Sequence, residues 1–142
     1  MKLIYLSLFL GAISIVGGSK AQAQIIGDLK ATIPFEFHAA GATLPAGSYI
    51  IHVVDGPEDN ILEIRGDDNH TVALLNTRDA RSPILPNMSE LLFNHAGNDY
   101  YLTRIFYQAS KDGAAVMDSG YSKKYGASAP IDQKQVAIYK SN

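Results

Sequence analysis

Residues 90–107 have the sequence ELLFNHAGNDYYLTRIFY, in which two runs rich in apolar and aromatic residues flank a glycine and an asparagine. Gly97 and Asn98 tolerate the positive φ angles that a tight hairpin turn requires. The spacing therefore predicts an antiparallel β-hairpin with its tip at these two residues. The predicted cross-strand pairs are Ala96 with Asp99, His95 with Tyr100, Phe93 with Leu102 and Leu91 with Arg104.

This register divides the hairpin into two faces. The apolar face is predicted to carry Leu91, Phe93, Tyr100, Leu102 and Phe106. The opposite face would carry Glu90, Leu92, Asn94, Tyr101, Thr103 and Ile105. Arg104 is the one charged residue placed on the apolar face, where its side chain must snorkel to solvent, pair with an acid or line a cavity. Because side chains alternate, a slip of one residue would exchange the two faces.

Four further strands are predicted before this hairpin from alternating apolar residues and from their β-branched and aromatic content. They cover residues 30–37, 48–54, 61–65 and 70–77. The first contains Pro34, which cannot donate a ladder hydrogen bond, so this strand is expected to lie at a sheet edge or to pair on one side only. The sequence LPAG at 44–47 predicts a turn, and the last two strands are predicted to form a second hairpin. Leu62 and Ile64 are expected on one face of it, with Glu63 and Arg65 on the other.

After residue 108 the composition shifts to Ala, Ser, Gly and Lys, so only a short helix or irregular arm is predicted for 116–125. Residues 134–140 regain strand character and are predicted to close the sheet. The chain is therefore expected to be all-β, an antiparallel β-sandwich or small barrel of about seven strands. A parallel α/β fold is excluded because no crossover helices are predicted. We expect one β domain, at 24–142.

The first 23 residues are predicted to be an export signal. Lys2 precedes an apolar run from Leu3 to Val16, and the sequence AQA at 21–23 fits the small-residue rule for cleavage after Ala23. The apolar run is shorter than the roughly 20 residues that a membrane anchor needs. The mature chain is therefore expected in the periplasm or outside the cell, with no stable membrane insertion.

The amino-acid composition excludes several kinds of catalytic site and one class of partner. The chain has no cysteine, which excludes cysteine nucleophiles, thiol redox chemistry and cysteine-ligated zinc. Without Lys2 and Lys20 the mature domain is acidic, and its basic residues are scattered along the sequence. Nucleic acid is therefore not expected as a partner, because phosphate backbones are bound by clustered basic residues.

Short motifs recur in an order typical of one group of proteins. They are IPFEF at 33–37, LPAGSY at 44–49, SELLF at 89–93, and Gly97 followed by YYL at 100–102. In these motifs the chain resembles small exported bacterial proteins, abundant in acidobacteria, that carry a signal peptide with P-F-x-F, L-P-A-G-x-Y and S-E-L-x-F motifs. The resemblance implies an exported domain, often with a charged helix before its last strand. It carries over no catalytic residue.

Histidines and acidic residues are the candidates for chemistry. The histidines are His38, His52, His70 and His95, and none has the close spacing of a metal-ligand motif, so surface or rim positions are expected. Two loops gather oxygen ligands that suit calcium, at 67–69 and at Asp55, Glu58, Asp59 and Asn60, but ordinary turns explain them. Glu36, Glu63 and Glu90 are expected on solvent faces, with a hydrolytic carboxylate pair as the alternative. Asn69 and Asn87 begin N-glycosylation patterns, which matter only in a eukaryotic source.

Aromatic residues offer a further possibility. Tyr100, Tyr101 and Tyr107 are concentrated on one predicted strand and form a candidate surface for a sugar or a protein partner, although plain sheet packing is the more common role. Whether the sheet encloses a hollow interior for an apolar small molecule or a filled core is left open.

Two hypotheses about function follow. The first is an exported, non-enzymatic β-domain that binds a small ligand, a glycan or an envelope protein; no catalytic, cofactor or metal residue is assigned to it. The alternative is a small secreted hydrolase built from dispersed His and Glu residues. It predicts that at least two of these side chains come within hydrogen-bond reach in one cleft.

Overall fold

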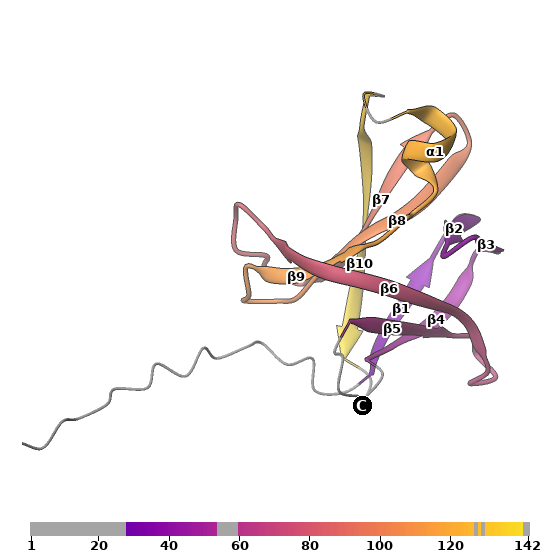
Figure 1. Ribbon diagram of the computed structural model, residues 1–142. Helices are drawn as coiled ribbons and strands as arrows, with labels where there is room; N and C mark the ends of the chain where they lie inside the picture. The colour runs from indigo at the N-terminus through magenta and orange to yellow at the C-terminus, as the bar shows by residue number, and fades with distance from the viewer. Residues whose placement is uncertain (1–27, 54–59, 127, 129, 141–142) are drawn as a thin grey trace, which may run out of the picture.

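The computed structural model describes residues 28–53, 60–126, 128 and 130–140 (Figure 1). These residues form ten strands and one short helix. The elements are β1 (Leu29–Ile33), β2 (Phe37–Ala39), β3 (Ala42–Leu44), β4 (Gly47–Val53), β5 (Ile61–Arg65), β6 (Thr71–Arg81), β7 (Ser89–Ala96), β8 (Asp99–Phe106), β9 (Asp112–Val116), α1 (Tyr121–Tyr125) and β10 (Asp132–Lys140). The predicted signal segment, 1–23, lies outside the described residues.

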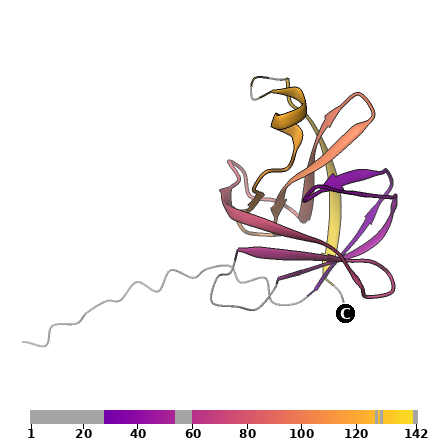
Figure 2. The same cartoon turned by 45° about the vertical axis from the view of Figure 1, so that its right-hand side comes forward.

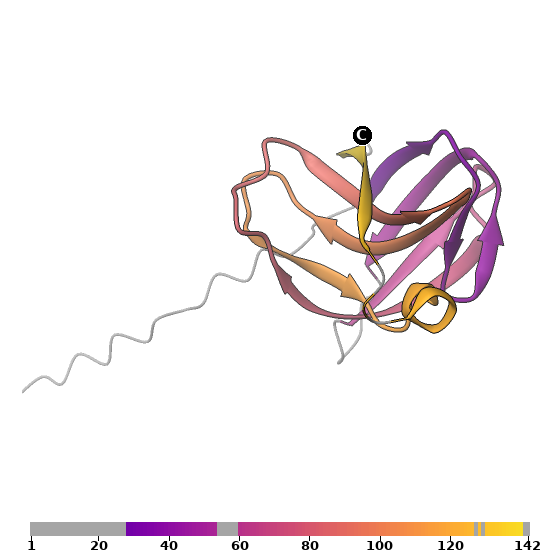
Figure 3. The same cartoon turned by 90° about the horizontal axis from the view of Figure 1, so that it is seen from above.

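Eight of the strands close into an antiparallel β-barrel. Their order is β8-β7-β10-β1-β4-β5-β6-β9, and pairing between β9 and β8 completes the ring, which is visible from above in Figure 3. The β2–β3 hairpin is attached outside this ring, through a parallel pairing of His38 with Tyr101 on β8. The all-β prediction and the short helix before the last strand are confirmed. The barrel resolves the choice that the sequence left open between barrel and sandwich.

Side chains occupy the inside of the barrel. Alternate residues of each strand point inward, as the pleat of a β-strand requires. Nine large side chains are less than 2% exposed: Phe37, Phe93, Ile33, Ile51, Ile64, Leu75, Leu91, Leu102 and Ile105. The ring of Phe93 packs edge-on against Phe35 and Phe37, with centroids 5.2 and 5.5 Å away. The domain therefore has a packed apolar core without any disulfide.

The β7–β8 hairpin has the predicted turn and the predicted pairs near it, but its register changes halfway. Phe93 lies opposite Leu102 as expected, whereas Leu92 pairs with Arg104 and Leu91 pairs with Ile105. A β-bulge between Leu92 and Phe93 causes the shift. The predicted pairing of Leu91 with Arg104 is therefore wrong.

The bulge also exchanges the two faces of β8 beyond it. Ile105 points into the core and is fully buried, while Phe106 lies on the outer side of the barrel wall. Arg104 is exposed on the outside. Its guanidinium therefore needs no buried partner, contrary to its predicted place on the apolar face.

The predicted strand at 30–37 is in fact two strands. β1 ends at Ile33 and β2 begins at Phe37, with Pro34 in the irregular segment between them. β1 pairs with β4 on one side and with β10 on the other, so it lies inside the sheet rather than at an edge. Proline ends the strand here because it has no N–H to continue the ladder.

Strand β9 was not predicted, and its small residues have a packing reason. An alanine Cβ at Gly113 would lie 2.3 Å from the carbonyl oxygen of Ile105 and 2.4 Å from the ring of Phe106. The Phe106 ring thus occupies the space that a side chain on β9 would need. The predicted closing strand is confirmed, because β10 pairs with both β1 and β7.

The only helix among the described residues, α1, has five residues and lies between Gly120 and Gly126. Both glycines have positive φ angles, 84° and 85°, which limit the helix to little more than one turn. In the part of the chain that the structure describes, no helix has the length and hydropathy needed to cross a membrane.

Candidate functional site

Tyr100 and Tyr101 of β8, and Tyr107 directly after it, are buried or partly buried. Tyr100 lies between Phe35 and His95, with ring centroids 3.9 and 4.3 Å away. Tyr101 is 6% exposed, and Tyr107 is half-buried, which raises the pKa of its hydroxyl. These rings have little free face on which a sugar could stack, so the aromatic strand serves chiefly the packing of the domain.

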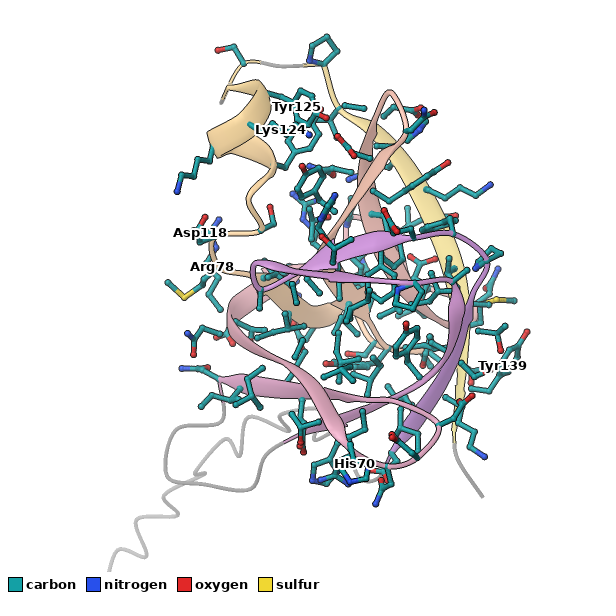
Figure 4. All side chains as sticks on the ribbon, turned by 90° about the vertical axis from the view of Figure 1, so that its right-hand side faces the viewer. His70, Arg78, Asp118, Lys124, Tyr125 and Tyr139 are labelled. Atoms are coloured by element: carbon teal, nitrogen blue, oxygen red, sulfur yellow. The ribbon has the colours of Figure 1, made fainter. Side chains whose placement is uncertain are left out.

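Helix α1 covers Tyr101 and is held to the barrel by the Asp99 cluster, which comprises Asp99, Lys124, Tyr125 and His38. The ammonium of Lys124 donates to Asp99 at 2.6 Å, and the hydroxyl of Tyr125 donates to the same oxygen. His38 Nε2 lies 3.6 Å from the other oxygen. Lys124 and Tyr125 are labelled on α1 in Figure 4.

The groups of this cluster shift one another's pKa values. The hydrogen bonds from Lys124 and Tyr125 lower the pKa of Asp99 to about 2. The same carboxylate raises the pKa of Lys124 and that of Tyr125. Asp99 therefore stays ionised at neutral pH and serves as an electrostatic anchor for α1.

His38 also contacts a hydroxyl group. Its Nδ1 lies 3.0 Å from Oγ1 of Thr43 on the neighbouring strand β3. A hydroxyl, an imidazole and a carboxylate thus follow one another in space from Thr43 through His38 to Asp99. This is the arrangement by which a hydroxyl is activated as a nucleophile, although Asp99 is already bonded to α1.

A second polar cluster lies on the outside of β4 and β5. His52 Nδ1 lies 2.6 Å from Oδ1 of Asp28, and His52 is opposite Glu63 in the β4–β5 ladder. The guanidinium of Arg65 donates to Glu63 through two nitrogens, at 3.0 and 2.7 Å, and the hydroxyl of Thr71 donates to its other oxygen. These bonds from Arg65 and Thr71 lower the pKa of Glu63.

Glu63 corrects the expectation of a solvent-face charge, since only 9% of the residue is exposed. The hydrogen bonds from Arg65 and Thr71 compensate for the loss of water around its carboxylate. Glu90 is half-buried, and burial raises its pKa. Glu36 is exposed, as predicted.

The remaining histidines have separate partners. His70 pairs with Asp68 at 3.0 Å in the β5–β6 turn, and His95 pairs with Asp132 at 3.2 Å. No hydrogen bond among the described residues joins two of the seven candidate His and Glu side chains. The described ranges also hold no group of three or more His, Asp or Glu arranged to bind a metal ion.

The two predicted oxygen-rich loops differ in what the structure shows. Residues 66–70 form a closed turn, in which the amide of Gly66 donates to His70 and that of Asn69 donates to Gly66. Asn69 has a φ of 62°, the left-handed conformation that asparagine tolerates. In the other loop, Asp55, Glu58 and Asp59 lie outside the described residues.

A shallow depression of about 270 Å³ lies beside this turn. It is lined by the 44–49 segment, by Gly66 and Asp67 of the β5–β6 turn, and by Val72 of β6. The hydroxyl of Tyr49 donates to the carbonyl of Pro45 at 2.6 Å, which fixes the wall of the depression. Burial and, secondarily, the negative charge of Asp67 raise the pKa of Tyr49.

Strand β6 borders the depression and has an incomplete set of partners. Its first half pairs with β5, and its second half pairs with β9 on the other side. The carbonyl of Asn76 accepts the amide of Met117 at the end of β9, while the amide of Thr77 donates to Asn60 on the β5 side. Backbone groups of alternate residues point to the same edge, so those of Leu74 face the same way as those of Asn76.

Between Asn76 and the start of β6, that edge has no paired strand among the described residues. Within the described ranges, no strand is hydrogen-bonded to β6 at Leu74 on the side away from β5. β3 contacts β6 without pairing with it, and it belongs to the indigo-to-violet hairpin above β6 in Figure 2. Leu74 is 57% exposed and Val72 is 37% exposed. We call this edge at 72–74, together with the adjoining depression, the β6 groove.

The β6 groove was not anticipated from the sequence. The run at 70–77 predicted a strand, but the divergence of its two partner strands is a tertiary feature without a local signal. Comparisons of the chain with protein families, with curated proteins and with solved structures found no match. Inferences about function therefore rest on the geometry of this chain.

Proposed function

We propose that this chain is an exported, non-enzymatic β-barrel domain that binds a partner on its outer surface, in the cell envelope or outside the cell. The observation that carries the proposal is the filled interior of a closed barrel. Barrels that carry small ligands hold them inside, and here the buried side chains of Ile51, Phe93 and Leu102 occupy that place. Binding therefore falls to the exterior. Export rests on the predicted signal at 1–23, and kinship with the small exported bacterial proteins is part of the same proposal.

Native mass spectrometry tests this proposal. The protein is purified, without refolding, from the periplasm or medium of an exporting bacterial host. We expect the mass of residues 24–142 with no retained small molecule, because the core leaves no place for one. A stoichiometric adduct that survives desalting and contacts the core would overturn the proposal, as would a mass that includes the first 23 residues.

A secreted hydrolase is the second candidate, and the Thr43–His38–Asp99 arrangement is the observation that favours it. Hydrolysis would require His38 to take the Thr43 proton and Asp99 to orient the imidazole. Lys124 and Tyr125 already hold the Asp99 carboxylate, which weakens that role. We expect p-nitrophenyl acetate to be hydrolysed equally by the native protein and by the Thr43→Val and His38→Gln variants. A loss of turnover above about tenfold in both variants would support the hydrolase instead.

A further inference from the structure

We propose that the β6 groove binds an extended peptide segment that carries an apolar side chain next to a lysine or arginine. The segment adds to β6 as an antiparallel strand at Leu74. This inference rests on the proposed function and specifies the surface and the partner. It follows from three features of the groove: free backbone groups, apolar lining and acidic charge.

The free backbone groups define the mode of binding. The N–H and C=O of Leu74 point to the edge that β9 leaves uncovered, and they are spaced to exchange two hydrogen bonds with one residue of an added antiparallel strand. Peptides that add a strand in this way gain affinity from main-chain bonds and specificity from pockets for alternate side chains. The side chain of Leu74, 57% exposed, offers apolar contact at the same place.

The depression supplies the pocket for one side chain. Its walls include Leu44, Pro45, Ala46 and Val72, so its surface is largely apolar. A volume of about 270 Å³ accommodates one aliphatic side chain with part of its backbone, rather than a complete drug-sized ligand. The extended form of the partner follows, because only a segment that continues along β6 can also use the Leu74 edge.

The negative charge of the groove determines which residue of the peptide should lie beside its apolar one. Asp67 lines the depression and is exposed, and no ion pair with Asp67 is present among the described residues. Asp68 and His70 follow in the same turn, with the Asp68 carboxylate paired to His70. Glu63 above the turn is neutralised by Arg65. The uncompensated charge at the groove is therefore negative, and it favours a basic residue beside the apolar one.

A second copy of the chain is a less complementary occupant. The whole chain has a formal net charge of −2, so two copies repel weakly, whereas a basic peptide is attracted. Self-association through β6 is nevertheless an outcome that the experiment below detects.

The test uses the ¹⁵N-labelled protein from an exporting host and capped synthetic peptides as probes. The first probe is KVTVKV, which combines alternating valines with lysines. The charge control is EVTVEV, and the strand control is KPTPKP, which lacks alternate N–H donors. We expect KVTVKV alone to shift the amide resonance of Leu74 in a saturable way and to slow hydrogen exchange at that amide.

Two variants, one of them with a matched control, separate the contribution of the Asp67 charge from that of the Leu74 backbone N–H. Asp67→Asn removes one exposed charge, so we expect it to weaken KVTVKV binding by about two- to fivefold and to make it less dependent on salt. Leu74→Pro removes an N–H that faces the open edge and takes part in no ladder bond, so the barrel should fold while binding is lost. Leu74→Val is its matched control, because it keeps the N–H and only shortens the apolar side chain.

The experiment distinguishes peptide binding at the β6 groove from binding elsewhere and from self-association. Equal binding of KVTVKV and EVTVEV, shifts confined to another surface, or an unchanged affinity in Leu74→Pro would each overturn the inference. Line broadening at Leu74 that grows with protein concentration, without peptide, would replace it with self-association. Any of these results leaves the proposed function standing if native mass spectrometry detects no small molecule retained by the protein. The search would then move to the 82–88 connection, where Ile84 is 72% exposed.

Discussion

The hydroxyl of Thr103 donates a hydrogen bond to the carbonyl of Leu92, 3.1 Å away across the β7–β8 ladder. This bond lies at the β-bulge where the register of the hairpin shifts by one residue. Bulges leave backbone groups without their ladder partners. Here a side chain supplies the missing donor, and the residues that follow, Arg104 and Ile105, point outward and inward respectively.

Thr103→Val should destabilise the protein. Valine has nearly the same shape, but it cannot donate to the Leu92 carbonyl, so the free energy of unfolding should fall by about 1 kcal/mol. Urea denaturation measures the change. Thr103→Ser retains the hydroxyl and should recover part of the loss. Equal stability of the Val and Ser variants would show that the bond contributes nothing to the bulge.

Gly113→Ala should be more damaging than an alanine at another strand glycine. The new Cβ would overlap the carbonyl of Ile105 and the ring of Phe106, so the closure between β8 and β9 must shift. We expect a loss of about 2 kcal/mol or more in the free energy of unfolding.

Gly47→Ala is the matched control, since the nearest atom to its Cβ would be 3.7 Å away on Tyr49. It should stay within about 0.5 kcal/mol of the native protein. If both alanine variants unfold at the same urea concentration, the close approach of Phe106 to β9 is not a constraint on the fold.

The docking of α1 should depend on pH in the acidic range. The pKa of Asp99 is about 2 in the folded chain, against an ordinary value of 3.8. A lowered folded-state pKa stabilises the fold above the ordinary pKa, and that contribution disappears as the pH falls toward the folded value. We therefore expect α1 to loosen between about pH 4 and pH 2.

The near-ultraviolet circular dichroism of Tyr101, Tyr121 and Tyr125 reports this change, because their rings pack together. Asp99→Asn lacks the carboxylate, so its spectrum at neutral pH should already resemble that of the native protein at pH 2. A transition of the same size between pH 4 and pH 2 in Asp99→Asn would assign the effect to another acid.

Local patterns sufficed for most of the strands. Alternation at 61–65 placed Leu62 and Ile64 inside and Glu63 outside, and the turn at Gly97 set the first pairs of the β7–β8 hairpin correctly. The closing role of β10 followed from its late position and from its β-branched residues. These features depend on the two-residue alternation of apolar side chains and on turn-forming residues, both of which can be recognised in short segments of sequence.

The features that local sequence patterns did not predict depend on contacts between segments distant in the sequence. β9 has a weak strand pattern, and its glycine at 113 is required by the carbonyl of Ile105 and the ring of Phe106. The bulge at Thr103 reverses Arg104 and Ile105 without any change in composition. Likewise, the burial of Glu63 depends on Arg65 and Thr71 reaching the same carboxylate. The β6 groove exists because β5 and β9 cover different halves of one strand, a relation between segments far apart in sequence.

The most direct test of the filled interior is whether the native barrel takes up a small apolar molecule. Benzene is titrated into the native protein and into Leu102→Ala, whose truncated side chain should leave a cavity at a cost of about 2–5 kcal/mol. Methyl resonances of the core leucines and isoleucines are followed by NMR. We predict saturable shifts in Leu102→Ala and none in the native protein. Saturable shifts of the core methyls in the native protein would show a hollow barrel and would contradict a function confined to its outer surface.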